Sequence, residues 1–166
     1  MSDTGRTVCK YTKFQIEDAG GVMRDIPVNN YGAIGTSFAE VDLTAQQDAI
    51  ANVLNGQGSF STTITGPFDN SPAVAASGTG ARPALSGSHT VLSALNGGQT
   101  ARSFGFYLGI QGDWETNDPV YGGIDCILVS GYTVDPAAGT YSAKLTVASS
   151  RTNDPAWGTA AIAASS

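Results

Sequence analysis

Apolar and polar side chains alternate along much of the chain, and this pattern predicts a domain built mainly of β-strands. Phe60, Thr62 and Ile64 alternate with smaller hydroxyl-bearing residues, which gives a two-residue period with one more apolar face. The run begins after Asn55-Gly56 and stops at Gly66-Pro67, so both ends carry residues that break regular structure. The same period predicts further strands at residues 8–17, 22–26, 37–43, 101–110, 124–134 and 141–148.

The alternation also predicts which side chains share a face and so are candidates for the core. Three strands supply the clearest sets, because most of their large apolar residues fall on one side. These candidates are Val8, Phe14, Ile16, Phe104, Phe106, Leu108, Ile110, Tyr141, Ala143, Leu145 and Val147.

The series that begins at Thr44 has the pattern of a helix. Thr44 and Gln47 have the spacing of a capping box, in which each side chain bonds a free backbone N–H of the first turn. Apolar residues ending at Leu54 share one side, and Asn55-Gly56 supplies a stop. These signals predict a helix over residues 45–54.

A second short helix is expected at residues 88–95. Val91, Leu92 and Leu95 have the spacing of one helix face, and the glycines after Asn96 end the pattern. We expect this helix to cover the open end or one face of the sheet. The predicted loops between these elements are residues 27–36, 69–84 and 111–123.

Together these elements predict an antiparallel β-sandwich or barrel with one or two short flanking helices. With 166 residues the chain is long enough for one domain with its own core. We expect a single domain over residues 1–166, with an N-terminal arm at 1–7 and a small-residue C-terminal tail at 149–166.

Composition changes this picture mainly through the scarcity of charge. Charged residues make up 13% of the chain, about half the usual share. So few charges suggest that other subunits cover much of the surface, although a low-charge secreted β-protein has the same composition. The net charge of −6 argues against a surface that binds nucleic acid, because such surfaces concentrate Lys and Arg.

No apolar run approaches the length of a membrane-spanning helix, and the first residues lack the apolar stretch of a signal peptide. We therefore expect folding in a reducing cytoplasm. Cys9 and Cys126 both fall in strand-like sequence, where cysteine is typical of a small buried apolar residue. The sequence alone leaves both alternatives, two free thiols or a disulfide between them.

Catalytic chemistry has no clear signature in this sequence. The single histidine, His89, begins the second predicted helix, where capping is a simpler explanation than a catalytic triad. The glycine pairs Gly56-Gln57-Gly58 and Gly78-Thr79-Gly80 lack the lysine of a phosphate-binding loop and its strand-to-helix setting. We expect no enzymatic activity and no catalytic or cofactor-binding residues.

The loop at residues 111–123 is the one place where acidic residues gather. Asp113, Glu115 and Asp118 offer oxygen ligands that would suit a divalent cation. Their spacing matches no EF-hand, and solvated loop carboxylates are far more common. We expect no metal site here.

Read in order, several segments resemble the tail tube (major tail) proteins of long-tailed, siphophage-like bacteriophages. The resemblance spans roughly residues 8–148 and rests on the order of short, degenerate motifs. These are VMRDI, EVDLT, LNGQGSFSTTITGPFD, SGSHTVLSALNGG, SFGFYLG and IDCILVSGYTV followed by YSAKLTV.

The resemblance implies a structural virion protein that self-assembles into hexameric rings, which stack into the hollow tail tube through which phage DNA passes. It implies that strands near 60–64 and 104–110 build the core and the inner sheet, and that residues 27–56 and 69–84 reach neighbouring rings. Other tail proteins would contact the tube ends, assembly would take place in the host cytoplasm, and DNA would meet no specific binding site. The helix predicted at 45–54 departs from the family pattern, in which an extended segment is expected.

Two other functions fit parts of the sequence. A capsid decoration protein or a host-surface-binding β-module of a virion would have the same fold class, but would attach to a preformed surface instead of assembling by itself. A small secreted hydrolase or carbohydrate-binding domain is expected to carry a signal peptide and a clustered set of polar catalytic residues, and we find neither pattern in this sequence.

Overall fold

The computed structural model describes residue 5 and residues 9–74 and 86–165, and strands dominate this part of the chain. The elements are η1 (Cys9–Tyr11), β1 (Thr12–Glu17), β2 (Met23–Ile26), β3 (Asn30–Tyr31), β4 (Ser37–Asp42), β5 (Val53–Ser59), β6 (Ser61–Pro67), α1 (Ser88–Leu95), β7 (Arg102–Leu108), β8 (Val120–Asp135), β9 (Thr140–Val147) and β10 (Ala156–Gly158).

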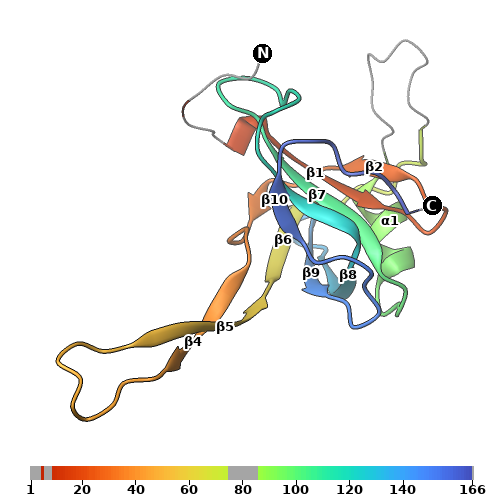
Figure 1. Ribbon diagram of the computed structural model, residues 1–166. Helices are drawn as coiled ribbons and strands as arrows, with labels where there is room; N and C mark the ends of the chain where they lie inside the picture. The colour runs from red at the N-terminus through yellow and green to blue at the C-terminus, as the bar shows by residue number, and fades with distance from the viewer. Residues whose placement is uncertain (1–4, 6–8, 75–85, 166) are drawn as a thin grey trace.

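All strand pairs between these elements are antiparallel, which confirms the predicted fold class. The main sheet has the order β2-β1-β7-β8-β9-β6-β3, and β10 adds to β8. Strands β4 and β5 pair only with each other and extend away from the main sheet (Figure 1). The fold is therefore a curved antiparallel sheet with one helix and a projecting two-stranded ribbon.

The main sheet curls until its two halves face each other. Strands β6 and β7 are three positions apart in the sheet order, which in a flat sheet is about 14 Å. Yet the rings of Phe60, just before β6, and Phe104 on β7 stack at 5.6 Å. At the edges, the Tyr31 hydroxyl donates to the Thr12 carbonyl oxygen at 3.2 Å, so β3 comes close to β1.

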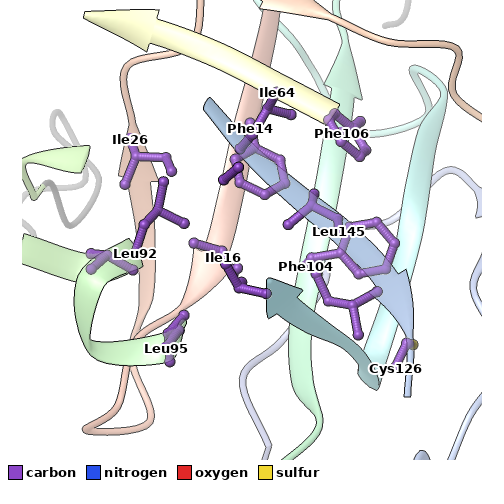
Figure 2. Packing of buried hydrophobic residues seen from close by; sticks show 14 of the residues in the cluster. Phe14, Ile16, Ile26, Ile64, Leu92, Leu95, Phe104, Phe106, Cys126 and Leu145 are labelled. Atoms are coloured by element: carbon purple, nitrogen blue, oxygen red, sulfur yellow. The ribbon is translucent and has the colours of Figure 1, made fainter. Parts of the chain in front are cut away.

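The core lies between these two halves (Figure 2). Most of the predicted core residues are buried there: Phe14, Ile16, Phe104, Phe106, Tyr141, Ala143 and Leu145. Leu108 and Val147 are only half-buried because they end their strands, and Ile110 is half-buried beyond the end of β7. Val8 lies outside the described residues.

The long strand β8 carries the bend. Its first part pairs with β7 and its second part with β9, so it belongs to both halves of the sheet. Asp125, near the change of partner, has a φ of 52°, a conformation that few non-glycine residues adopt. At Gly122, an added Cβ would overlap the Phe104 carbonyl, so glycine permits the close approach of β7.

Helix α1 has the bounds that the sequence predicts. Val91, Leu92 and Leu95 are buried, and Figure 2 shows Leu92 and Leu95 pointing into the core. The helix packs on β8 and β9. The expectation that this helix covers one part of the sheet is confirmed.

The prediction of a helix at residues 45–54 is wrong. Residues 43–52 form the turn of a β-hairpin, and Val53 and Leu54 belong to β5, paired with Asp42 and Val41. Thr44, predicted as a helix cap, instead helps to close this turn: its hydroxyl accepts a hydrogen bond from the Asn52 amide, and the carboxylates of Asp42 and Asp48 accept hydrogen bonds from the amides of Thr44 and Ala45.

Smaller differences occur at other boundaries. The first strand begins at Thr12, after a 3₁₀ turn, and β8 begins at Val120, inside the segment expected to be a loop. Residues 27–36 contain the two-residue strand β3, which pairs with β6.

The segment after residue 148 crosses the outer side of β7 and β8. Its strand β10 pairs with β8, and the Ile162 amide donates to the Tyr107 hydroxyl at 2.9 Å. Near its end, the Ser165 hydroxyl donates to the Glu17 carboxylate at 2.6 Å. We call residues 149–165 the C-terminal strap. Among the described residues, no helix is long and apolar enough to cross a membrane.

Candidate assembly interface

The β4–β5 hairpin is the most unusual surface of the molecule, and we call residues 37–59 the ribbon. It projects from the body, at the lower left of Figure 1. Every residue of β4 is exposed, and so is nearly every residue of β5. The ribbon contains no Lys or Arg.

The ribbon has one apolar and one mainly polar face. Val41 and Leu54 are cross-strand partners and so share a face, which Leu43 joins by alternation along the chain. These three side chains are 43%, 57% and 58% exposed, respectively. The opposite face carries the pair Glu40 and Asn55.

A bulge near Gly56 shapes the ribbon between its base and its outer part. Glu40 pairs with Asn55 and Phe38 pairs with Gly58, so three residue steps on β5 oppose two on β4. A Cβ at Gly56 would lie 3.1 Å from the Ala39 carbonyl oxygen, which explains the need for a small residue. Asn55-Gly56 is thus an interior feature of a strand and not a helix stop.

The turn of the ribbon is held by side-chain hydrogen bonds. The Thr44 amide donates to the Asp42 carboxylate at 2.9 Å, and the Ala45 amide donates to Asp48 at 2.8 Å. Hydrogen bonds from the side chain and the backbone amide of Thr44 lower the pKa of Asp42. Beyond this polar framework, Ile50 is 80% exposed at the turn.

A two-stranded ribbon with an exposed apolar face is marginally stable by itself in water. Clustered exposed apolar side chains on a soluble protein are typical of interaction sites. The ribbon is therefore the candidate functional site, and its chemistry is that of a protein–protein contact.

A groove of about 920 Å³ lies where the ribbon meets the body. Phe38 of the ribbon and Trp157 of the strap line it and are both more than half exposed. Below them, the ring of Tyr121 packs against Trp157 at 5.1 Å and its hydroxyl lies 2.6 Å from the Thr36 hydroxyl. Burial raises the pKa of Tyr121. The groove is therefore lined by aromatic side chains from both the ribbon's base and the body.

His89 does not cap its helix, so that interpretation is wrong. The N-cap residue is Gly87, and it makes no side-chain cap bond. The Nδ1 atom of His89 lies 3.0 Å from the Tyr132 hydroxyl, and its ring packs on Phe68 at 5.0 Å. These contacts fasten the start of α1 to the sheet.

The acidic loop does not bring its three carboxylates together. Asp113 and Glu115 are exposed, whereas Asp118 is 2% exposed and accepts a hydrogen bond from the Glu115 amide at 3.0 Å. Trp114 donates its indole N–H to the Asp118 carbonyl oxygen, which closes the loop further. Within the described residues, no three His, Cys, Asp or Glu side chains are grouped to hold a metal.

The structure places some of the remaining candidates from the sequence, which are the two cysteines and the two glycine pairs. Cys126 is a free, buried thiol, and burial raises its pKa to about 11. The side chain of Cys9 lies outside the described residues, as does Gly78-Thr79-Gly80. Gly56-Gln57-Gly58 is part of β5.

Sequence reasoning missed the ribbon's apolar face because Ile50, Val53 and Leu54 also fit a helical spacing. A signal for the hairpin was present, since the alternation of β4 continues through Val41 and Leu43. If residues 45–54 were a helix, the strand that carries this alternation would have no partner strand directly after it.

Comparisons with known proteins identify the fold. No protein-family model matches the chain, and no curated protein matches its sequence. Among solved structures, a chain in the cryo-EM structure of the sheath/tube terminator of an extracellular contractile injection system (PVC) in its extended state superposes with a TM-score of 0.54 at 10% identity, covering 94% of this chain and 99% of that chain. A chain in the sheath-tube complex of such a system superposes with a TM-score of 0.51 at 10% identity, covering 93% of both chains. At this identity the likeness is one of fold, and the fold of this chain is that of chains found in sheath and tube assemblies.

Proposed function

We propose that this chain is a structural protein of a tail-like particle, which assembles into stacked hexameric rings that form a hollow tube for the passage of phage DNA. The observation that carries this proposal is the exposed apolar face of the ribbon, formed by Val41, Leu43 and Leu54. A face of this kind needs a covering surface, and further copies of the same chain supply one.

The fold likeness supports the same function. The two solved chains come from structures of the sheath/tube terminator and the sheath-tube complex of a contractile injection system, and each covers more than nine tenths of this chain. The order of the sequence motifs resembles that of siphophage-like tail tube proteins, so the two likenesses agree on a tail-like particle, and the siphophage type rests on the sequence resemblance alone. The hexameric ring number and the DNA cargo rest on that resemblance alone.

The shape of the ribbon favours a repeating, head-to-tail assembly. The ribbon contacts a surface elsewhere on the next copy, so the contact is head-to-tail, and head-to-tail contacts form closed rings or stacks. In this proposal the ribbon forms the part of residues 27–56 that reaches a neighbouring ring. Other tail proteins bind at the ends of the tube, and the chain has no enzymatic role.

The test is assembly of the purified chain alone. Negative-stain electron microscopy and sedimentation velocity, over a range of concentration and salt, are expected to show rings or hollow rods. A monomer that stays monomeric under all conditions contradicts the proposal and favours a decoration or host-surface-binding module instead.

A pair of adjacent substitutions tests the role of the ribbon. Leu54→Asp places a charge on the apolar face and is expected to abolish assembly, because a buried, unpaired carboxylate costs several kcal/mol. Asn55→Asp adds the same charge at the next residue, on the opposite face of the ribbon, and is expected to leave assembly intact. Equal loss of assembly in both variants, each still folded by circular dichroism, would show that the apolar face is not the contact.

A further inference from the structure

The outer side of the β6–β9–β8 half of the sheet is a regular array of short hydroxyl side chains. Cross-strand partners share a face, so the register gives three rows across the three strands. These rows are Ser61–Thr146–Leu128, Thr63–Lys144–Ser130 and Thr65–Ser142–Thr133. We call these nine residues the hydroxyl face.

The inward neighbours confirm which way the hydroxyl face points. Ile64, Leu145 and Val129 alternate with it along the three strands, and all three are buried in the core. The nine outward residues are exposed or half-buried. In such an array, neighbours lie about 4.8 Å apart across strands and about 7 Å apart along them.

The chemistry of the hydroxyl face differs from the rest of the surface. Seven of its nine residues are Ser or Thr, Lys144 is its single charged residue, and it holds no carboxylate. The acidic residues lie elsewhere, for example Glu40 and Asp42 on the ribbon and Asp113 in the acidic loop.

This face is poorly suited to become a buried contact between subunits. Ser is depleted in the cores of protein interfaces, and Ser and Thr are under-represented among the residues that dominate binding. The ribbon is better suited to a buried contact between subunits, because it presents the apolar side chains Val41, Leu43 and Leu54. The outer side of β7 and the first part of β8 is already covered by the C-terminal strap, which bonds Tyr107 and Glu17. The hydroxyl face is thus the bare sheet surface that stays wet.

We propose that the hydroxyl face is the wall of the channel in the assembled tube, an inference that rests on the proposed function. Short side chains make this wall smooth, and Ser and Thr hydroxyls exchange hydrogen bonds freely with water. Affinity for DNA comes mainly from Lys and Arg at phosphates, and each copy offers only Lys144 here. The wall therefore lets a polyanion pass by being nearly neutral and well hydrated. It does not need the repulsive carboxylates that the acidic net charge suggests.

The face continues into the ribbon, which is consistent with this arrangement. Ser61, at one end of the array, is separated from β5 only by Phe60. A ribbon that extends to the next ring along the tube would hold the three strands of the array in line with their copies in that ring.

Labelling of a single added cysteine by reagents of two sizes tests the inference. Thr63→Cys lies at the edge of the middle row and changes an exposed residue of similar size. In assembled tubes, a small maleimide is expected to label it, whereas a maleimide on a polyethylene glycol too large for the channel is not. Thr159→Cys, exposed on the strap side, is expected to react with both reagents, and wild-type chain measures the background from Cys9 and Cys126.

Each outcome decides the question when electron microscopy of the same sample accompanies the labelling. Reaction of Thr63→Cys with both reagents in intact tubes places the face on the outside, and reaction with neither places it in a contact; both results overturn the inference. As a control, the Thr63→Cys chain must react with both reagents when it is not assembled into tubes. Absence of tubes from wild-type chain removes the proposed function itself, and with it this inference.

Discussion

At the scale of single residues, Glu17 is the most constrained charged side chain among those described. It is 1% exposed, and its carboxylate accepts hydrogen bonds from the amide of Ser103 and from the hydroxyl of Ser165, with the Arg102 guanidinium at 3.8 Å. Burial by itself would raise the pKa of Glu17, but the hydrogen bonds from Ser165 and Ser103 outweigh it and lower the pKa. This carboxylate links β1 and β7 to the strap.

The lowered pKa predicts a specific loss of stability in acid. The folded chain binds this proton less tightly than the unfolded chain, so ionised Glu17 stabilises the fold above its unfolded pKa of about 4.3. That contribution is lost as the pH falls through the lower folded pKa. Glu17→Gln is expected to be less stable than wild type at neutral pH and to show a flatter dependence between about pH 5 and pH 2.

Urea unfolding at a series of pH values measures this difference. Glu40→Gln, which changes an exposed carboxylate on the ribbon, serves as the control and should follow the wild-type curve. Stability curves for Glu17→Gln and wild type that stay parallel through the acid range would contradict the role given to Glu17.

At the scale of elements, helix α1 and the ribbon differ in how their sequences relate to their structures. For α1, spacing and burial agree, because Val91, Leu92 and Leu95 all pack into the core. For residues 45–54, helical spacing was present, but pairing of β5 with β4 prevailed. Local propensity is weak, and a partner strand next to a short segment overrides it.

Helix α1 is expected to depend on Leu92 for its attachment to the sheet. Leu92 is fully buried, so Leu92→Ala removes core contacts and leaves a cavity, which costs about 2–5 kcal/mol. Ser93→Ala changes the exposed neighbouring residue and should cost much less. Urea unfolding followed by fluorescence measures both, and similar losses in the two variants would mean that α1 contributes little to the core.

At the scale of the whole molecule, assembly brings together many copies that each carry a net charge of −6. Like charges on neighbouring copies repel, and the acidic ribbon adds to this at the contact. Apolar burial must overcome that repulsion, so the balance depends on ionic strength.

Raising the salt concentration from about 0.03 M to about 0.3 M is therefore expected to favour assembly, because a higher ionic strength shortens the distance over which the like charges of neighbouring copies repel each other. Light scattering and sedimentation at fixed protein concentration measure the change, with Leu54→Asp as a control that stays unassembled at both salt levels. Tubes that dissociate as salt rises would instead indicate contacts between opposite charges.

The sequence by itself determined the fold class, most strand positions, helix α1 and most of the core. These features follow from periodicity, because a buried face leaves its two-residue or 3.6-residue repeat in the chain whatever its neighbours are. Only the tertiary structure decided the ribbon, the curl that brings Phe60 onto Phe104, and the packing of the strap on Tyr107 and Glu17. The ribbon depends on the pairing of β5 with β4, which prevails over a helical spacing in the same residues. The curl and the packing of the strap depend on contacts between residues far apart in the chain, and such contacts leave no local repeat. The same is true of the hydroxyl face, whose residues lie on three strands and form one surface only through the register of β6, β9 and β8.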